Sequence, residues 1–340
     1  MDEFQFISQI TQESYRQAHI VKGIGDDAAV FRSLGEDLVI AVDTFVEGIH
    51  FTEQTLSPEQ LGYRVLAVNL SDMAAMGAEP RAYLVSLVAT KKQDQSFYRQ
   101  IYSGMEGLAS KYGIDLIGGD TVLGKELAIS ITVLGSVPRD KARYRSEAKP
   151  GDLVFVTGTL GDSRAGLQLL LDSTKTCHLP TFSSWEKSLI ARHQKPTPRV
   201  DFATNLRPLK RVALNDISDG IANELYEIAG SSNVTITIDD RSLPISDELR
   251  NFPRSLRDEW KLFGGEDFEL VGTVAEEDFP FVKQIGNKLD VQVTKIGTVS
   301  YNESGKGKVF LFKNGVKKRL KKRGYIHRSG DSNDEVKYDK

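Results

Sequence analysis

The chain contains a single cysteine, Cys177, among its 340 residues. One thiol cannot form an internal disulfide, and the same count excludes a cysteine-rich zinc or iron–sulfur site. The first residues, Met-Asp-Glu-Phe-Gln-Phe, lack the basic and apolar regions of a signal peptide. No apolar run approaches the roughly 20 residues that a bilayer span requires. We therefore expect a cytoplasmic protein with no membrane partner.

A strong charge of either sign is also missing, since the formal net charge is −3. Acidic and basic residues are spread along the chain, so the sequence offers no extended basic surface and we expect no nucleic-acid partner. The exception is the segment 317–340, which opens with lysines and arginines and closes with acidic residues. Such a run is more often a solvated, partly mobile tail than a phosphate-binding patch.

With 40% apolar and 27% charged residues, the composition is ordinary for a protein of about two domains. Apolar residues alternate over 38–42 and over 127–133 as in strands, and helical patterns alternate with such segments, which predicts a mixed α/β fold. The polar stretch 137–152 contains two prolines and a glycine and indicates a domain boundary. We expect an N-terminal domain over 1–138 and a C-terminal α/β domain over 149–316, followed by the tail.

The most informative feature is a set of aspartates in glycine-rich turns or on otherwise apolar faces. A carboxylate in such a place is costly to desolvate unless it takes up a proton, pairs with arginine or lysine, or binds a cation. The members of the set are Asp26, Asp27, Asp43, Asp72, Asp120, Asp216 and Asp219.

Asp72 shows how a carboxylate is directed inward. Residues 57–60, Ser-Pro-Glu-Gln, have the pattern of a capping box with proline at the first helical position, which predicts that a helix begins there. Leu61, Val65 and Val68 recur at helical spacing, and Asp72 returns to the same buried face. A helix-capping or salt-bridge role is the alternative for Asp72 taken alone, so the hypothesis depends on the whole set.

The other aspartates lie where ligands are commonly bound. We expect Asp43 and Asp120 at the carboxyl ends of strands, where open α/β sheets place their ligands. Asp216 and Asp219 directly precede an expected helix over 221–229, whose free N-terminus attracts anions. Structural capping by Asp219 is the alternative there.

Carboxylates that converged in this way would repel one another, and a hard divalent cation with oxygen ligands removes that repulsion. Mg²⁺ with a polyphosphate fits best, because Mg²⁺ takes one or two carboxylates and completes its shell with phosphate oxygens and water. Residues 23–28 imitate a dinucleotide-binding turn, but its two aspartates would face the pyrophosphate. Residues 119–126 imitate a P-loop, yet Glu126 replaces the required Ser or Thr. Any bound ATP must be held in another way.

Short motifs follow one another along nearly the whole chain. They are Gly23-Ile24-Gly25-Asp26-Asp27-Ala28, Asp43-Thr44, Gly48-Ile49-His50-Phe51, Ala67-Val68-Asn69-Leu70-Ser71-Asp72-Met73-Ala74-Ala75-Met76-Gly77-Ala78, Gly118-Gly119-Asp120-Thr121, Lys149-Pro150-Gly151-Asp152, Val156-Thr157-Gly158, Gly161-Asp162-Ser163, Asp216-Ile217-Ser218-Asp219-Gly220, Gly264-Gly265-Glu266-Asp267-Phe268-Glu269-Leu270 and Gly324-Tyr325-Ile326-His327. In this order they resemble the motifs of the thiamine-monophosphate kinase family.

The resemblance implies the two-domain fold of the aminoimidazole-ribonucleotide synthetase superfamily, with an N-terminal domain that pairs with its twin in a homodimer. It also implies ATP-dependent, Mg²⁺-dependent phosphorylation of thiamine monophosphate to thiamine diphosphate in a cleft between the domains. The implied metal ligands are Asp27, Asp43, Asp72, Asp120, Asp216 and Asp219. The implied ATP contacts are Gly119, Asp120, Arg145 and Ser218, and the implied thiamine monophosphate contacts are His50, Glu266 and Tyr325.

The chemistry of these side chains is compatible with those roles. The guanidinium of Arg145 matches a polyphosphate, although an arginine in a polar linker is more often solvated. Glu266 could accept hydrogen bonds from the aminopyrimidine, and Tyr325 could stack on the cationic thiazolium. A lone histidine such as His50 is otherwise more often structural.

Two positions depart from the family pattern. Ala41-Val42 precede Asp43 where the family often has Ser or Thr, so a ligand there would have to be a backbone carbonyl. Arg328 follows His327 in place of the family's usual aromatic residue.

The implied mechanism is direct in-line transfer to a phosphate oxygen that is already anionic, so no general base and no catalytic side chain of that kind is expected. One alternative is another ATP-using member of the superfamily. A second is a non-catalytic calcium or magnesium module, although no EF-hand loop is present. A third is a magnesium-dependent phosphohydrolase. Product analysis separates all of them.

Overall fold

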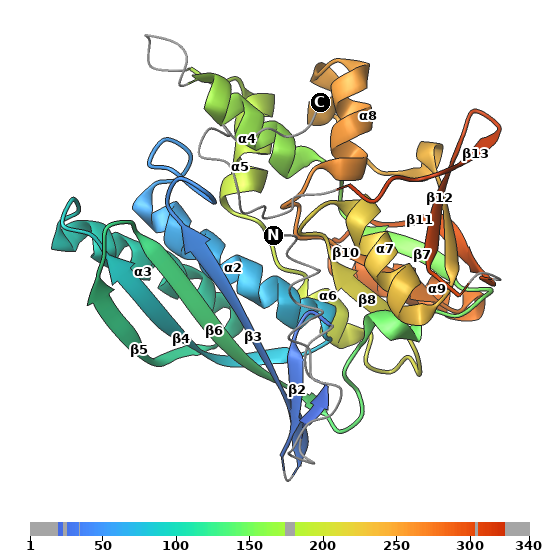
Figure 1. Cartoon of the computed structure of the whole chain (residues 1–340), viewed down its shortest axis with the longest axis horizontal. Helices are drawn as coiled ribbons and strands as arrows, with labels where there is room; N and C mark the ends of the chain where they lie inside the picture. Colours follow the sequence, from blue (N-terminus) through green and yellow to red (C-terminus); the bar gives the residue numbers. More distant parts are fainter. Residues whose placement is uncertain (1–19, 23–25, 34, 174–180, 303–304, 324–340) are drawn as a thin grey trace.

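The computed structural model describes residues 20–22, 26–33, 35–173, 181–302 and 305–323. Over these residues the chain forms two β-sheets that lie next to each other, each accompanied by helices (Figure 1). The predicted mixed α/β architecture is therefore confirmed. Among the described helices, none has the length and apolar character that a bilayer crossing needs.

The first sheet has six strands in the order β1-β2-β3-β6-β4-β5. Its strands are β1 (Ile20–Lys22), β2 (Ala29–Arg32), β3 (Glu36–Val46), β4 (Glu79–Ala89), β5 (Asp115–Leu123) and β6 (Ala128–Pro138). The alternation predicted over 127–133 is confirmed, because Leu127, Ile129, Ile131 and Val133 are all buried. These side chains face the helices of the N-terminal half.

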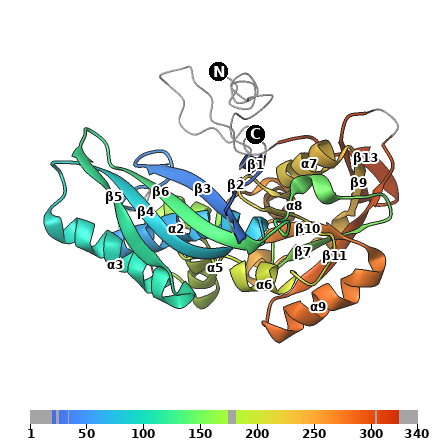
Figure 2. The same ribbon diagram turned by 90° about the horizontal axis from the view of Figure 1, so that it is seen from below.

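Helices α2 (Pro58–Ala75) and α3 (Gln95–Tyr112) cover one face of this sheet (Figure 2). The predicted capping box at the start of α2 is confirmed, since Ser57 Oγ accepts from the backbone N–H of Gln60 and the Gln60 side chain accepts from that of Ser57. No described element covers the opposite face of the sheet, on which Val42 is 60% exposed. We call this surface the open face.

The second sheet has seven strands in the order β13-β12-β9-β11-β7-β10-β8. Its strands are β7 (Leu153–Thr157), β8 (Ala213–Asp216), β9 (Thr235–Asp239), β10 (Leu270–Val274), β11 (Val293–Ser300), β12 (Lys308–Lys313) and β13 (Val316–Arg319). The helices of this half are α4 (Asp162–Ser173), α5 (Ser184–Gln194), α6 (Val200–Asn205), α7 (Ile221–Ser232), α8 (Arg254–Phe263) and α9 (Phe279–Lys288). Short 3₁₀ turns are η1 (Arg145–Glu147), η2 (Asp240–Ser242), η3 (Glu248–Asn251) and η4 (Glu276–Asp278).

The two faces of the second sheet join different cores. Val154 and Val156 of β7 pack with α7, whereas Phe155 of the same strand joins the core that contains α2 and α6. Helix α2 itself contacts α6 and β8. One buried helix therefore packs against both halves of the protein and fixes the surfaces that face each other between them.

The position predicted for Asp43 at a strand end is wrong, because β3 continues past it to Val46 and Asp43 lies opposite Ile131 of β6. The long antiparallel ladder with β6 supplies backbone partners beyond residue 42 and extends the strand.

The strand end predicted for Asp120 is also wrong. The residues Gly118-Gly119 do not form a turn, because a register shift between β4 and β5 absorbs one extra residue and the strand runs on to Leu123. Gly119 has a φ of 150°, and a Cβ there would lie 1.9 Å from the carbonyl oxygen of Val85. Glycine is thus needed for close strand approach, and Asp120 lies within an edge strand.

The expected tail begins later than predicted. Val316–Arg319 forms β13, which pairs antiparallel with β12. Basic residues on an exposed edge strand discourage pairing with other chains, which accounts for this part of the basic run. The segment 324–340, including Tyr325, His327 and Arg328, lies outside the described residues.

Candidate active site

Three of the predicted carboxylates meet between the two halves. Asp27 lies two residues before the start of β2, Asp72 lies in the last turn of α2, and Asp216 ends β8. One oxygen from each lies within 4.8 Å of the others. The hydroxyl of Ser71 donates to Asp216 Oδ2 at 2.7 Å, which links α2 to β8 at this point. Helix α2 and the ends of two strands thus build the acid cluster.

Asp43 is the fourth member of the cluster, since its carboxyl group shares a hydrogen bond with that of Asp72. Its backbone N–H donates to Asn69 Oδ1 at 3.1 Å, and Asn69 Nδ2 donates to the carbonyl of Val65 on the preceding turn. Asn69 therefore ties β3 to α2 and holds Asp43 beside Asp72.

Burial and mutual repulsion make these carboxyl groups difficult to ionise. Burial, and then the charge of Asp27, raises the pKa of Asp216 to about 8. Burial, followed by Asp43 and Asp216, raises the pKa of Asp72 well above its ordinary value, and burial also raises that of Asp43. Oxygen donors that repel one another in this way suit a hard divalent cation, which would replace their protons.

Arg145 of η1 also enters the cluster. Its guanidinium forms an ion pair with Asp27, with Nε 3.0 Å from Oδ2, and Nε also donates to Asn215 Oδ1 at 3.0 Å. The neighbouring Asp26 has a side chain that is 1% exposed, and its Oδ2 atom lies 3.6 Å from Lys22 Nζ. Arg145 is thus the positive charge that offsets Asp27 in this structure.

The start of α7 forms the wall next to Asp216. Gly220, not Asp219, occupies the N-cap position, so the capping alternative for Asp219 is wrong. Instead the backbone N–H of Asp219 donates to Glu224 Oε1 at 3.0 Å, and the Ser218 hydroxyl lies 3.5 Å from the same oxygen. Asn215 Nδ2 donates to Glu224 Oε2 at 2.7 Å. Glu224 therefore organises this wall from inside the protein.

Asp120 does not join the cluster within one chain. Asp43, Ile131, Val85 and Gly119 lie in register on four adjacent strands, so β5 is three strand spacings, about 14 Å, from Asp43. Asp120 points to the open face with Thr44, Ser130 and Ser86, which are in register with it on those strands, and it is exposed. The predicted convergence is therefore wrong for Asp120 in the single chain, because strand pairing fixes the separation.

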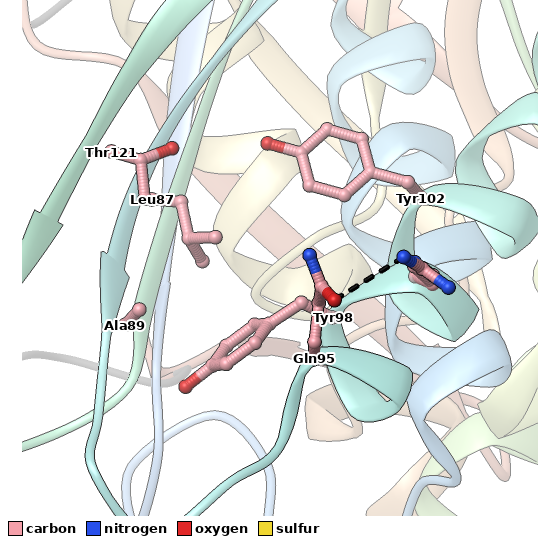
Figure 3. Close-up of a pocket in the computed structure, with 7 residues that line it drawn as sticks. Leu87, Ala89, Gln95, Tyr98, Tyr102 and Thr121 are labelled. Atoms are coloured by element: carbon pink, nitrogen blue, oxygen red, sulfur yellow. Dashed lines mark hydrogen bonds between the residues drawn. The ribbon is translucent and has the colours of Figure 1, made fainter.

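A hollow of about 380 Å³ opens beside Asp120, on the helix side of the same strand. It is lined by Leu87, Ala89, Gln95, Tyr98, Arg99, Tyr102 and Thr121. Figure 3 shows the ring of Tyr98 and the side chain of Leu87 at its wall, with the Tyr102 hydroxyl pointing toward Thr121. Arg99 donates to Gln95 at 3.2 Å across its rim.

The predicted substrate contacts His50 and Glu266 lie near each other. His50 Nδ1 accepts the backbone N–H of Val46 at 3.1 Å, and its charge influences the pKa of Glu266. Glu266 lies in the turn before β10, where its N–H donates to the carbonyl of Ser218 at 2.6 Å. This brings Glu266 beside the wall at α7. Tyr325 lies outside the described residues.

Comparisons with known proteins match both halves of the chain. Residues 25–137 match the AIR synthase related protein, N-terminal domain, and residues 149–310 match the C-terminal domain of the same family. A thiamine-monophosphate kinase of Bacillus subtilis (strain 168) is 46% identical over 330 residues, which cover 96% of this chain and 99% of the relative. The chain belongs to the thiamine-monophosphate kinase family.

Solved structures of this family share the fold. A structure of "AaThiL complexed with AMPPCP and TMP" superposes with a TM-score of 0.82 at 32% identity, covering 96% of this chain and 97% of the other. A thiamine-monophosphate kinase from Stenotrophomonas maltophilia K279a gives a TM-score of 0.76 at 36% identity, covering 87% and 92%. The aminoimidazole-ribonucleotide synthetase type of fold, which the sequence motifs implied, is therefore confirmed.

Several residues that build this thiamine-monophosphate kinase family site were missed by the sequence reasoning. Asn69 and Ser71 lie within the quoted motif around Asp72, and their hydrogen bonds to Asp43 and Asp216 could have been suspected from polar residues on a buried helix face. Glu224 gave no such signal, because a glutamate in the first turn of a helix is common.

The raised pKa values give a testable pH dependence. The folded pKa of Asp216, about 8, exceeds the ordinary value of about 4, so folding favours the protonated form. Stability from this source is complete below pH 4 and is lost as the pH rises through 8. We expect the thermal unfolding midpoint of the protein in EDTA to fall between pH 6 and pH 9, and Mg²⁺ to reverse that fall. A midpoint in EDTA that rises over this range would contradict the acid cluster as described.

Proposed function

We propose that the chain transfers the γ-phosphate of ATP to the phosphate of thiamine monophosphate, giving ADP and thiamine diphosphate. The observation that carries the proposal is the cluster of Asp27, Asp43, Asp72 and Asp216 between the two halves. The loop that contains Glu266 is joined to Ser218, close to Asp216 in the chain. The relative solved with AMPPCP and TMP supports it, since AMPPCP is an ATP analogue and TMP is the abbreviation of the acceptor. We place the reaction in the cytoplasm.

Magnesium is the cofactor that these residues suit. Asp27, Asp43, Asp72 and Asp216 would hold it directly, and Asp219 would do so from the start of α7. When bound, magnesium would neutralise the facing phosphate groups and let them approach in line. The chain's own contribution is to fix four carboxyl groups, with the help of Ser71 and Asn69, at the place where the phosphates would meet and a cation would replace their protons.

The remaining residues divide between the two substrates. Arg145 and Ser218, which are linked through Asn215 and Glu224 beside the cluster, would contact the ATP phosphates. The apolar hollow beside Thr121 suits the nucleotide base. His50 and Glu266 would contact thiamine monophosphate, together with Tyr325. No side chain needs to remove a proton, because the attacking phosphate oxygen is already anionic. In this scheme residues 1–138 bind ATP and magnesium, residues 149–316 complete the site, and 317–340 follow them.

We further propose that the active form is a homodimer built through the open face. This face exposes apolar side chains that a single chain leaves uncovered, among them Phe31, Val42 and Val122. Sheets pack face to face when such a surface is covered by a second copy. Asp120 and Gly119 lie on the β5 edge of this surface, too far from their own cluster to serve it. We propose that Asp120 acts on the site of the other subunit.

The reaction itself is tested by product analysis. We expect ADP and thiamine diphosphate to form one for one from ATP and thiamine monophosphate, with no turnover in EDTA. A magnesium-dependent phosphohydrolase would instead release inorganic phosphate and make no thiamine diphosphate. That result, or equal ATP consumption without thiamine monophosphate, would refute the kinase proposal.

Arg145→Met should weaken the binding of ATP and strengthen the binding of a metal ion without nucleotide. Loss of the guanidinium should raise the KM for ATP by about 10- to 100-fold, because this is the change in affinity expected when a hydrogen bond to a charged group is lost. The same change frees Asp27, so Mn²⁺ titrated without nucleotide should bind about 10-fold more tightly than to the wild type. The electron paramagnetic resonance signal of free Mn²⁺ gives the dissociation constant for Mn²⁺. Weaker Mn²⁺ binding by the variant would show that Arg145 does not compete with the metal for Asp27.

A further inference from the structure

Arg64 is a fully buried arginine on α2 that has no part in the mechanism above. Its Nη2 atom lies 2.7 Å from Glu266 Oε1, and its guanidinium carbon lies 5.6 Å from the centre of the Phe268 ring. The described residues offer its Nε and Nη1 atoms no hydrogen-bond acceptor. Burying a guanidinium whose N–H groups lack acceptors lowers the stability of the fold. We therefore look for a role of Arg64 other than packing.

Glu266 is held in a strained backbone by the loop that contains it. Its φ of 69° lies in the left-handed region, which a non-glycine residue adopts at a cost of about 1 kcal/mol or more. The carbonyl of Ser218 accepts its N–H, and a Cβ at Gly265 would lie 2.6 Å from that same oxygen. The loop therefore cannot relax, and the direction of the Glu266 carboxylate is set by its partners.

Those partners are Arg64 on one side and His193 on the other. His193 Nδ1 lies 3.8 Å from Glu266 Oε2 and 3.1 Å from Ser163 Oγ. Burial, and then the charge of Arg64, lowers the pKa of His193 to about 3, so this imidazole is neutral. Burial opposes ionisation of Glu266, yet Arg64 and then the other neighbours outweigh it and keep its pKa below the ordinary value. Arg64 is therefore the first of the groups that keep Glu266 ionised.

We propose that Arg64 is a positioning residue that presents Glu266, ionised and fixed in direction, to the organic base of the phosphate acceptor. Glu266 is 31% exposed on its side chain, so part of the carboxylate is free to contact a ligand while Arg64 holds the rest. The carboxylate of Glu266 can only accept hydrogen bonds while it is ionised. In a largely desolvated place it selects a ligand that offers an N–H donor and rejects one that offers a lone pair. The selected chemical class is an aminopyrimidine.

This inference rests on the proposed function, and one set of measurements tests both separately. Formation of thiamine diphosphate by the wild type reports on the function. For Arg64, we compare thiamine monophosphate with the analogue in which oxygen replaces the exocyclic amino group of the pyrimidine. In Arg64→Met we expect the KM for thiamine monophosphate to rise about 30-fold, within the range for breaking one side of a buried charge pair. We expect the KM for ATP to change less than about 3-fold and the preference for the amino compound to collapse.

Controls distinguish positioning from general damage. Arg64→Lys keeps a cation beside Glu266 and should restore most of the affinity, whereas Arg250→Met removes an exposed arginine paired with Asp247 and should change nothing. The double variant Arg64→Met with Glu266→Gln removes both charges and keeps the test valid where the single variant fails to fold. Its KM should equal that of Glu266→Gln alone. An additional loss caused by Arg64→Met in the Glu266→Gln background, or a parallel rise in the KM for ATP, would overturn the proposal.

Discussion

Asp72→Asn should lower kcat by at least about 10³-fold, which corresponds to about 4 kcal/mol of transition-state stabilisation. Asp72 lies at the centre of the cluster, since the charges of Asp43, Asp216 and Asp27 all act on its carboxyl group. The amide keeps the shape of the side chain but offers one neutral oxygen in place of a carboxylate. Initial rates of thiamine diphosphate formation at saturating substrates and Mg²⁺ measure the effect.

The same substitution should not unfold the protein. Removing one of several closely spaced like charges relieves repulsion, so the metal-free variant should unfold at the same temperature as the wild type or higher at pH 8. Added Mg²⁺ should stabilise the wild type but not the variant, because the site that it would bind is incomplete. An unfolding midpoint well below that of the metal-free wild type would mean that Asp72 is structural, which was the alternative for this residue taken alone.

Purified mixed dimers of Asp72→Asn and Asp120→Asn subunits should recover about half of the wild-type activity, although each variant alone is nearly inactive. In the mixed dimer, one site has both defects and the other has neither, if Asp120 serves the opposite subunit. Random mixing gives mixed dimers in half of the molecules, so two differently tagged subunits are co-expressed and the mixed dimers are purified through both tags. The rate of thiamine diphosphate formation measures the recovery.

The matched control for this experiment is the mixture of Asp72→Asn with Asp43→Asn. These two carboxyl groups share a hydrogen bond within one chain, so every site in the mixed dimer lacks one of them. That mixture should stay inactive. If the Asp72 and Asp120 variants also fail to complement each other in purified mixed dimers, Asp120 does not act across an interface.

The sequence predicted the local elements of the site better than their relative positions. The start of α2 and the inward direction of Asp72 follow from a capping pattern and from helical spacing, both of which involve neighbouring residues alone. The approach of Asp27 and Asp216 could be expected from the family motifs. Spacing along the chain contains no distance between residues 27 and 216, so the residues alone did not predict it.

The errors at Asp43 and Asp120 have one physical cause. Strand ends depend on the partner strand, and β6 extends β3 past Asp43 while β4 carries β5 past the glycine pair before Asp120. Arg64 was missed for a related reason. An arginine at helical spacing ordinarily lies on the solvent side, and its burial arises from the loop of Glu266 and Phe268, which belongs to the other half of the protein.

Helix α2 places Arg64 and Asp72 eight residues apart on one rigid rod, which corresponds to about 12 Å along its axis. Arg64 pairs with Glu266, and Asp72 belongs to the acid cluster. The distance between the group that would hold the pyrimidine and the groups that would hold the phosphates is thus set by the rise of an α-helix. This fixed spacing would select acceptors by length. Acceptors that are shorter or longer between ring and phosphate should have a lower kcat even when the ring and the phosphate are unchanged.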